Sequence, residues 1–331
     1  MNKTTCTNLL VGTVRRAVLN LSQTARPAVA PYLLAFVAAL LLPFAAHADK
    51  LNVVATTPDL AAIAREVGGD RAEVRSLAKP MEDPHFVQAK PSFIVALNKA
   101  DALIEGGAEL ESGWLSALLD GTRNRNITAG AGGRIAIAPR IEMLERPREL
   151  DRSHGDVHAS GNPHFLTDPE NAKIAAREIC EAFCKLDSAS ADFYRDNLGK
   201  FTARLDARLA DWRKTLAPLK GARIAAYHNT WAYFARRFEL NIDLFLEPKP
   251  GIPPSPAHLA SVVKTMKSDN VRAVIVEPFQ NRKTAESVAA QTGARVVDFA
   301  QHPGGVKGTE GGYVELMDYL VATLAKALDA K

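Results

Sequence analysis

Residues 188–219 read SASADFYRDNLGKFTARLDARLADWRKTLAPL, the longest stretch of the chain with unbroken helical spacing. Its apolar side chains recur every three to five positions with charged residues between them: Phe193, Leu198, Phe201, Leu205, Leu209, Trp212 and Leu216. No proline interrupts the pattern before Pro218. The stretch therefore predicts one helix, roughly 45 Å long at 1.5 Å per residue, that acts as a stiff connector.

On both sides of this helix, predicted strands alternate with predicted helices. Before it, strands are expected at 51–57, 74–78 and 102–105, with helices at 60–67 and 93–98. After it, strands are expected at 223–227, 242–246, 271–276 and 294–297, with helices at 230–238, 256–268, 282–292 and 313–330. This alternation is typical of parallel sheets with helices on both faces. We therefore expect an α/β protein with two lobes, 49–187 and 220–331, joined by the helix at 188–219.

The first 48 residues have the features of a secretion signal. They contain four Lys or Arg and no Asp or Glu, then an apolar run at 31–46, and end in Ala46-His47-Ala48. We expect cleavage before Asp49 and a periplasmic protein. An uncleaved anchor is the alternative, but the run of about 16 apolar residues is shorter than the ~20 that a spanning helix needs.

The charge of the chain and its cysteines give no support for a nucleic-acid-binding, membrane-binding or disulfide-stabilised protein. The leader holds four of the 41 Lys and Arg residues and none of the 37 Asp and Glu residues, so the rest of the chain is neutral. A neutral protein gives no reason to expect nucleic acid or an anionic membrane as a partner. Cys180 and Cys184 lie four positions apart in a helical stretch, where a disulfide would be strained, and we interpret them as structural.

Three histidines lie where chemistry is expected in an α/β fold. His85 follows Glu82-Asp-Pro, His164 follows Gly161-Asn-Pro, and His228 directly follows the strand expected at 223–227. Ligands of open α/β sheets bind outside the carboxyl ends of the strands, and three imidazoles suit tetrahedral Zn²⁺. The proline before His85 and before His164 has a fixed φ angle, which limits how far the histidine ring can move. From spacing alone, ordinary loop histidines remain an equal alternative.

These residues also occur in an order that resembles a known family. The ordered motifs are Glu82-Asp-Pro-His85 with Lys90-Pro-Ser92, Ala100-Asp-Ala-Leu-Ile-Glu-Gly-Gly107, Leu110-Glu-Ser-Gly-Trp114, Asn162-Pro-His164 with Asp168-Pro-Glu-Asn171, Tyr227-His-Asn-Thr-Trp231 with Tyr233-Phe234, and Gly251-Ile-Pro-Pro-Ser255. Over residues 51–328 the chain resembles the solute-binding proteins of zinc and manganese ABC importers, the ZnuA/TroA-like family. Each motif is weak alone, but their joint order is specific.

The resemblance implies a carrier that holds a metal ion in the cleft between its lobes. His85 and His164 would come from the N-terminal lobe and His228 from the C-terminal lobe. Such a protein captures Zn²⁺ in the periplasm and delivers it to a membrane permease with its cytoplasmic ATPase, as a monomer and with a zinc chaperone as a further possible partner. Histidine at the third position favours zinc over manganese, which prefers oxygen ligands. A manganese or iron carrier is the alternative.

The fourth ligand is where the sequence departs from the family pattern. Many relatives place an Asp in the loop before the last helix, where this chain reads Asp298-Phe-Ala-Gln-His302-Pro-Gly-Gly305. We rank His302 first, then Asp298, then a water. Glu277 ranks last as a ligand and is also a candidate acceptor for a ligand imidazole. His154 and His158 form either an accessory metal-collecting loop or merely a polar one.

A zinc-dependent hydrolase is the main alternative from another functional class. It would need an open coordination position and a carboxylate placed as general base. The sequence contains neither H-E-x-x-H nor the nucleophile elbow G-x-S-x-G. We therefore predict that the protein is not an enzyme, while an additional adhesive role remains open.

Overall fold

The computed structural model describes residues 50–147 and 158–329. The predicted signal peptide at 1–48 and His154 lie outside these ranges. Within them, no helix combines the length and the apolar character needed to cross a bilayer.

The N-terminal half of the chain forms a parallel four-stranded sheet in the order β2-β1-β3-β4. Its strands are β1 (Leu51–Ala55), β2 (Ala72–Ser76), β3 (Ala102–Glu105) and β4 (Arg134–Ala136). The helices of this half are α3 (Pro58–Gly68), α4 (Pro91–Asn98), α5 (Leu115–Asp120) and α6 (Pro169–Leu186). The central strand β1 has apolar residues on both faces: Val53 belongs to one buried cluster and Val54 to another. This two-sided burial is what a parallel sheet covered by helices requires.

The C-terminal half repeats the same arrangement, with a parallel sheet in the order β6-β5-β7-β8. Its strands are β5 (Arg223–Ala226), β6 (Asn241–Phe245), β7 (Ala273–Val276) and β8 (Arg295–Asp298). Its helices are α8 (Ala232–Phe238), α9 (Pro256–Ser268), α10 (Arg282–Thr292) and α11 (Tyr313–Ala327). In both sheets the chain leaves the central strand toward one side and returns on the other. Such switch points place loops from several strand ends around one crevice.

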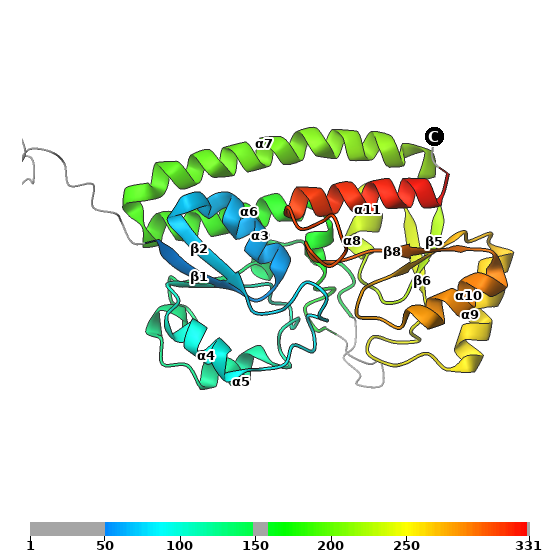
Figure 1. Cartoon of the computed structure of the whole chain (residues 1–331), viewed down its shortest axis with the longest axis horizontal. Coiled ribbons are helices and arrows are strands. Elements are labelled where there is room, and N and C mark those ends of the chain that lie inside the picture. The colour runs from blue at the N-terminus through cyan, green and yellow to red at the C-terminus, as the bar shows by residue number, and fades with distance from the viewer. Residues whose placement is uncertain (1–49, 148–157, 330–331) are drawn as a thin grey trace, which may run out of the picture. The chain divides into compact units, whose positions relative to one another are not determined.

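Helix α7 (Ala191–Leu216) lies along both halves, with α6 and α11 packed against it (Figure 1). One stripe of its side chains, including Leu205, Leu209 and Trp212, is fully buried. Trp212 donates its indole N–H to Asp318 of α11 at 2.7 Å, so the last helix of the chain is fixed to the connector. The expected long helix is therefore present, with a 3₁₀ turn at each end, over 188–190 and 217–219.

The expected elements are all present, within a few residues of their expected ends, but the described residues contain further α-helices and strands. They are β4, α5 and the full length of α6. Strand β4 has only three residues and follows Gly132-Gly133, so neither length nor alternation marks it. The fold class expected from the sequence, two parallel α/β lobes with a long connecting helix, is confirmed. The exact lobe boundaries stay a prediction.

A buried ion pair joins the two halves near their junction. Asp168 is the N-cap of α6 and accepts the backbone N–H of Glu170. Its carboxylate also receives two hydrogen bonds, at 2.7 and 2.8 Å, from the guanidinium of Arg237 in α8. The Asp168 side chain is fully buried, so this bidentate contact neutralises a charge that water cannot reach.

We expect Arg237→Ala to lower the free energy of unfolding by about 3 kcal/mol, because it leaves the buried Asp168 carboxylate uncompensated. Arg236→Ala is the matched control, since the adjacent Arg236 pairs with Glu142 at the surface at 3.4 Å. That control should cost less than about 1 kcal/mol. Urea denaturation of both variants measures the difference, and equal losses would contradict this role for the Asp168–Arg237 pair.

Candidate metal centre

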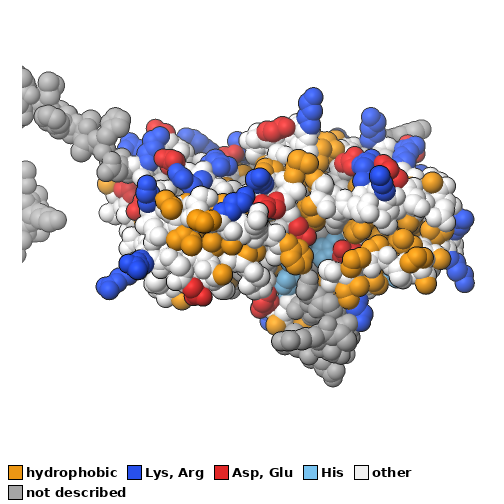
Figure 2. Space-filling view, turned by 60° about the horizontal axis from the view of Figure 1, so that its bottom comes forward, with side chains coloured by type: hydrophobic (Ala, Val, Ile, Leu, Met, Phe, Trp, Pro, Cys, Tyr) orange, Lys and Arg blue, Asp and Glu red, His pale blue; other side chains and the backbone are white. Residues whose placement is uncertain are grey.

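Three of the predicted ligands converge in the structure. His85, His164 and His228 each offer a ring nitrogen such that all three nitrogens lie within 4.8 Å of one another. Their ring centroids are 5.0 to 5.7 Å apart, and the rings meet edge to face. Figure 2 shows histidine side chains, in pale blue, at a hollow in the surface between hydrophobic side chains. Two cavities, of about 230 and 340 Å³, adjoin at His228.

His85 is positioned by the residues around it in the segment after β2. The carboxylate of Asp83 accepts both the backbone N–H of His85, at 3.0 Å, and its ring Nδ1–H, at 2.8 Å. The carbonyl of Pro84 accepts the indole N–H of Trp114 at 2.9 Å. These contacts fix both the backbone and the ring, so the His85 Nε2 has a defined direction.

His164 is held by a tight turn that depends on Gly161. Gly161 has φ +109°, and a Cβ there would lie 2.5 Å from the carbonyl oxygen of Leu144, so only glycine fits without strain. Asn162 then accepts the backbone N–H of His164 at 3.0 Å. The His164 Nδ1 lies 3.0 Å from Oε1 of Gln301, on the loop after β8. Its Nε2 is buried and has no hydrogen-bond partner among the described residues.

His228 extends from the carboxyl end of β5, at the switch point of the second sheet. Its Nδ1 lies 2.9 Å from Oε2 of Glu247, which follows β6. The neighbouring Asn229 and Asn162, from the His164 turn, both donate to Oε2 of Glu145, at 2.8 and 2.9 Å. The segments that carry His164 and His228 are thereby tied together although they are far apart in the sequence.

The same pattern holds at all three imidazoles. Each Nδ1 faces an oxygen, of Asp83, Gln301 or Glu247, that can only accept a hydrogen bond. Each Nδ1 therefore carries a proton, which makes Nε2 the nitrogen that each ring can offer to a metal ion. This outer shell is the arrangement that orients metal-binding histidines in proteins. The centre is therefore a set of three preoriented nitrogen donors.

The pKa values of His164 and His228, the two most buried rings of the trio, are shifted in opposite directions. Burial, together with the neighbouring imidazoles, holds the pKa of His164 well below its ordinary value, so this ring stays neutral. Burial also opposes the charged form of His228, but the hydrogen-bonded Glu247 carboxylate outweighs it and raises the pKa of His228. Of these two, His228 is therefore the ring that holds a proton to higher pH.

The candidates for a fourth ligand lie outside this trio. His302 is buried, and its Nδ1 lies 3.3 Å from Oδ1 of Asp59, at the start of α3. Asp298 pairs with Arg282 at the start of α10. Glu277 is buried after β7, where burial raises its pKa to about 7. None of the three belongs to the group of mutually close donors found among the described residues, so their role as ligands stays a prediction.

Other site residues were not expected from the sequence. Asp83, Glu247 and Gln301 hold the ligand rings, and Glu247 occupies the position of imidazole acceptor that the sequence suggested for Glu277. Asp83 lies two positions before His85, so the sequence could have indicated this pairing. The His228–Glu247 pairing spans 19 positions and joins two neighbouring strand ends of the C-terminal sheet, whereas the His164–Gln301 pairing spans 137 positions and depends on the packing of the two halves.

His158, from the predicted accessory loop, lies directly against the trio. Its Nε2 is 3.3 Å from Nε2 of His85. Burial and the neighbouring His85 lower the pKa of His158 to about 4. His258 lies at the start of α9, where its Nε2 is 3.0 Å from the carbonyl of Phe245, and takes no part in the centre.

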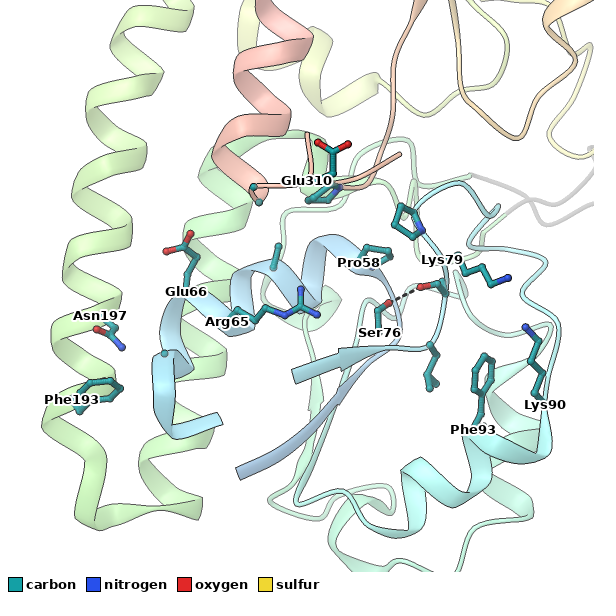
Figure 3. A pocket seen from close by; sticks show the side chains of 18 residues that line it. Pro58, Arg65, Glu66, Ser76, Lys79, Lys90, Phe93, Phe193, Asn197 and Glu310 are labelled. Carbon is teal, nitrogen blue, oxygen red and sulfur yellow. Dashed lines mark hydrogen bonds between the residues drawn. The ribbon is translucent and has the colours of Figure 1, made fainter. Parts of the chain in front are cut away.

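A larger cavity, of about 870 Å³, lies away from the histidines. Its labelled side chains, among them Arg65, Lys79, Phe93 and Glu310, are spread over several elements rather than gathered around one point (Figure 3). Both Lys and Glu side chains line it, and no histidine or cysteine does. Cavity size alone would therefore misplace the metal site of this protein.

Comparisons with known proteins identify a family and several relatives that match most of the chain. The family described as "Zinc-uptake complex component A periplasmic" matches residues 53–327. The iron-binding protein YfeA of Yersinia pestis is 27% identical, covering 84% of this chain and 86% of its own. The manganese ABC transporter substrate-binding lipoprotein PsaA of Streptococcus anginosus is 23% identical, covering 86% and 91%.

A solved structure shows the same fold. It is a zinc-bound deletion variant of ZnuA, 27% identical, with a TM-score of 0.71 over 84% of this chain and 98% of that one. Proteins of this kind bind a metal ion outside the cytoplasm for a membrane permease and its ATPase, and they are not enzymes. The family match over most of the chain shows that the protein belongs to the periplasmic component A family of zinc-uptake complexes, the metal-binding substrate-binding proteins of ABC importers.

Proposed function

We propose that this protein captures Zn²⁺ in the periplasm and delivers it to the permease of its ABC importer. The observation that carries the proposal is the convergence of three imidazoles whose Nδ1 atoms are each held by an oxygen acceptor. Such a set is preorganised, so little side-chain entropy remains to be lost when the ion binds.

The donor set favours zinc over the metals named for two of the relatives. Zn²⁺ binds imidazole nitrogen strongly in four-fold coordination, whereas Mn²⁺ prefers carboxylate, carbonyl and water oxygens. In this centre the nearby carboxylates of Asp83 and Glu247 are engaged by ring N–H groups. The two carboxylates therefore influence the ion only through the imidazoles that they hold. The atoms that face the ion are nitrogens.

Capture and release follow from the position of the ligands. His85 and His164 come from the segments after β2 and before α6, and His228 comes from the end of β5. A small relative shift of the two halves pulls the trio apart and weakens the site without any covalent chemistry. Helix α7 restricts that shift to a few ångströms, so docking to the permease is the event that releases the ion. Secretion through the 1–48 leader, action as a monomer and loading by a zinc chaperone complete the proposal.

The first test is zinc titration of the protein purified from the periplasm. We expect one Zn²⁺ per chain and, for His228→Ala, an affinity reduced at least 100-fold, because one of three oriented donors is lost. His258→Ala is the matched control, since His258 lies outside the centre, and should bind as the wild type does. If the wild type holds no stoichiometric zinc, or binds Mn²⁺ equally well, the zinc assignment is wrong.

Zinc binding should weaken as the pH falls, and the decline should begin above pH 6.5. Zn²⁺ must displace the proton of any charged ligand, and Glu247 raises the pKa of His228 above the ordinary ~6.5 of an imidazole. The proton bound to free His228 therefore competes with the metal at every pH below that raised pKa. Competition titrations with a chelator from pH 8.5 to 5.5 measure this dependence, and a flat affinity would contradict a histidine site.

Glu247→Gln separates the charge of Glu247 from its hydrogen bond. The amide oxygen can still accept from the His228 Nδ1, but the pKa of His228 falls when the charge is removed. We expect the decline in zinc affinity to begin at lower pH, with an affinity at pH 8 reduced by about tenfold because the ring becomes a weaker donor. An unchanged pH profile would show that Glu247 does not control His228.

A further inference from the structure

The contact between His158 and His85 brings a fourth imidazole nitrogen against the centre. The Nδ1–H of His85 is donated to Asp83, so the His85 Nε2 carries a lone pair. The His158 Nε2 lies 3.3 Å from it, with the two rings tilted by 30° and their centroids 5.2 Å apart. In the metal-free protein, a neutral His158 ring can donate its Nε2–H to this lone pair in a long hydrogen bond.

The distance between the His85 and His158 nitrogens matches that between two ligands of one tetrahedral zinc ion. In a tetrahedral site with Zn–N bonds of about 2.0 to 2.1 Å, two ligand nitrogens are ~3.3 to 3.4 Å apart. The His85 and His158 nitrogens already have this spacing. His158 also lines the 340 Å³ cavity together with His164 and His228, so it faces the other two ligands across the same space.

His158 is held in this place by a short anchored turn. Its carbonyl accepts the backbone N–H of Gly161 at 3.1 Å. Between them, Ser160 donates its backbone N–H and its hydroxyl to the carboxylate of Glu109, at 3.1 and 2.8 Å. The turn leads directly into the Gly161–His164 segment, so the backbone that places His158 also places the His164 ligand.

We propose that His158 is the fourth ligand of the metal ion, which closes the site as a tetrahedron of four imidazole nitrogens. This inference rests on the proposed function and adds a ligand to it. His158 lies outside the trio whose donors are all within 4.8 Å, so it completes the tetrahedron by moving toward His164 and His228 when the ion binds. The ion then has no open position for a water or a substrate, unlike the ion of a catalytic zinc site. Four nitrogen donors also discriminate most strongly against Mn²⁺.

X-ray absorption of the zinc complex and visible absorption of the Co²⁺ complex test the ligand count on protein purified from the periplasm. For the wild type we expect four imidazoles around zinc and the intense visible bands of tetrahedral Co²⁺. For His158→Ala we expect three imidazoles and one light oxygen ligand, weaker Co²⁺ bands if coordination expands, and zinc binding weaker on the order of 10- to 100-fold.

Three further variants keep this test decisive. His302→Ala and His258→Ala should leave the four-imidazole signal unchanged. Ser160→Ala removes the hydroxyl contact to Glu109 and keeps the His158 imidazole, so it should weaken zinc binding less than His158→Ala does. Thermal unfolding of the metal-free variants verifies that each is folded.

The outcomes separate this inference from the proposed function. Zinc bound by three imidazoles in both the wild type and His158→Ala would overturn the role of His158 and leave the carrier function intact. Loss of one imidazole in His302→Ala, with none lost in His158→Ala, would assign the fourth position to His302. Absence of zinc binding in the wild type would overturn the proposed function itself.

Discussion

The pairing of each ligand Nδ1 with an oxygen acceptor is the constraint on which the centre depends. A histidine ring without such a partner can rotate and can place its proton on either nitrogen, and three such rings in one crevice would rarely all present lone pairs. Asp83, Gln301 and Glu247 remove that freedom, each from a different segment. Because Gln301 and Glu247 come from the C-terminal sheet and Asp83 from the N-terminal half, the site exists only when both halves are in place. Metal binding and the relative position of the halves are therefore linked.

Several polar contacts hold the halves in that position. The buried Asp168–Arg237 pair joins α6 to α8, and Asn162 donates to the backbone oxygen of Asn229 at 2.9 Å. His302 reaches from the loop after β8 to Asp59 at the start of α3. The hydrogen bonds among these contacts are directional and 2.7 to 2.9 Å long, so a displacement of a few ångströms breaks them together. With α7 and α11 packed along both halves, the structure favours small movements over wide closure.

The buried environment of the ligands balances capture against release. Burial keeps His164 neutral, which spares the metal from competition with a proton, while Glu247 strengthens His228 as a donor and also its affinity for a proton. An ion in this crevice can contact several imidazole nitrogens as long as the histidines stay together. Once one histidine moves away, water can replace it as a ligand of the ion, and the affinity of the site falls. A carrier needs this contrast more than it needs extreme affinity.

The sequence by itself determined most of the elements and pointed to the three histidines that the structure brings together. The apolar period of α7 and the alternation of strands and helices are local properties, and His85, His164 and His228 stand at the ends of elements in recognisable motifs. Only the tertiary structure decided what surrounds them. The pairings His164–Gln301 and His228–Glu247, the contact of His302 with Asp59 and the approach of His158 to His85 all join segments that no local pattern relates. Which further side chain lies close enough to take part in the centre is set by the packing of these segments rather than by spacing along the chain.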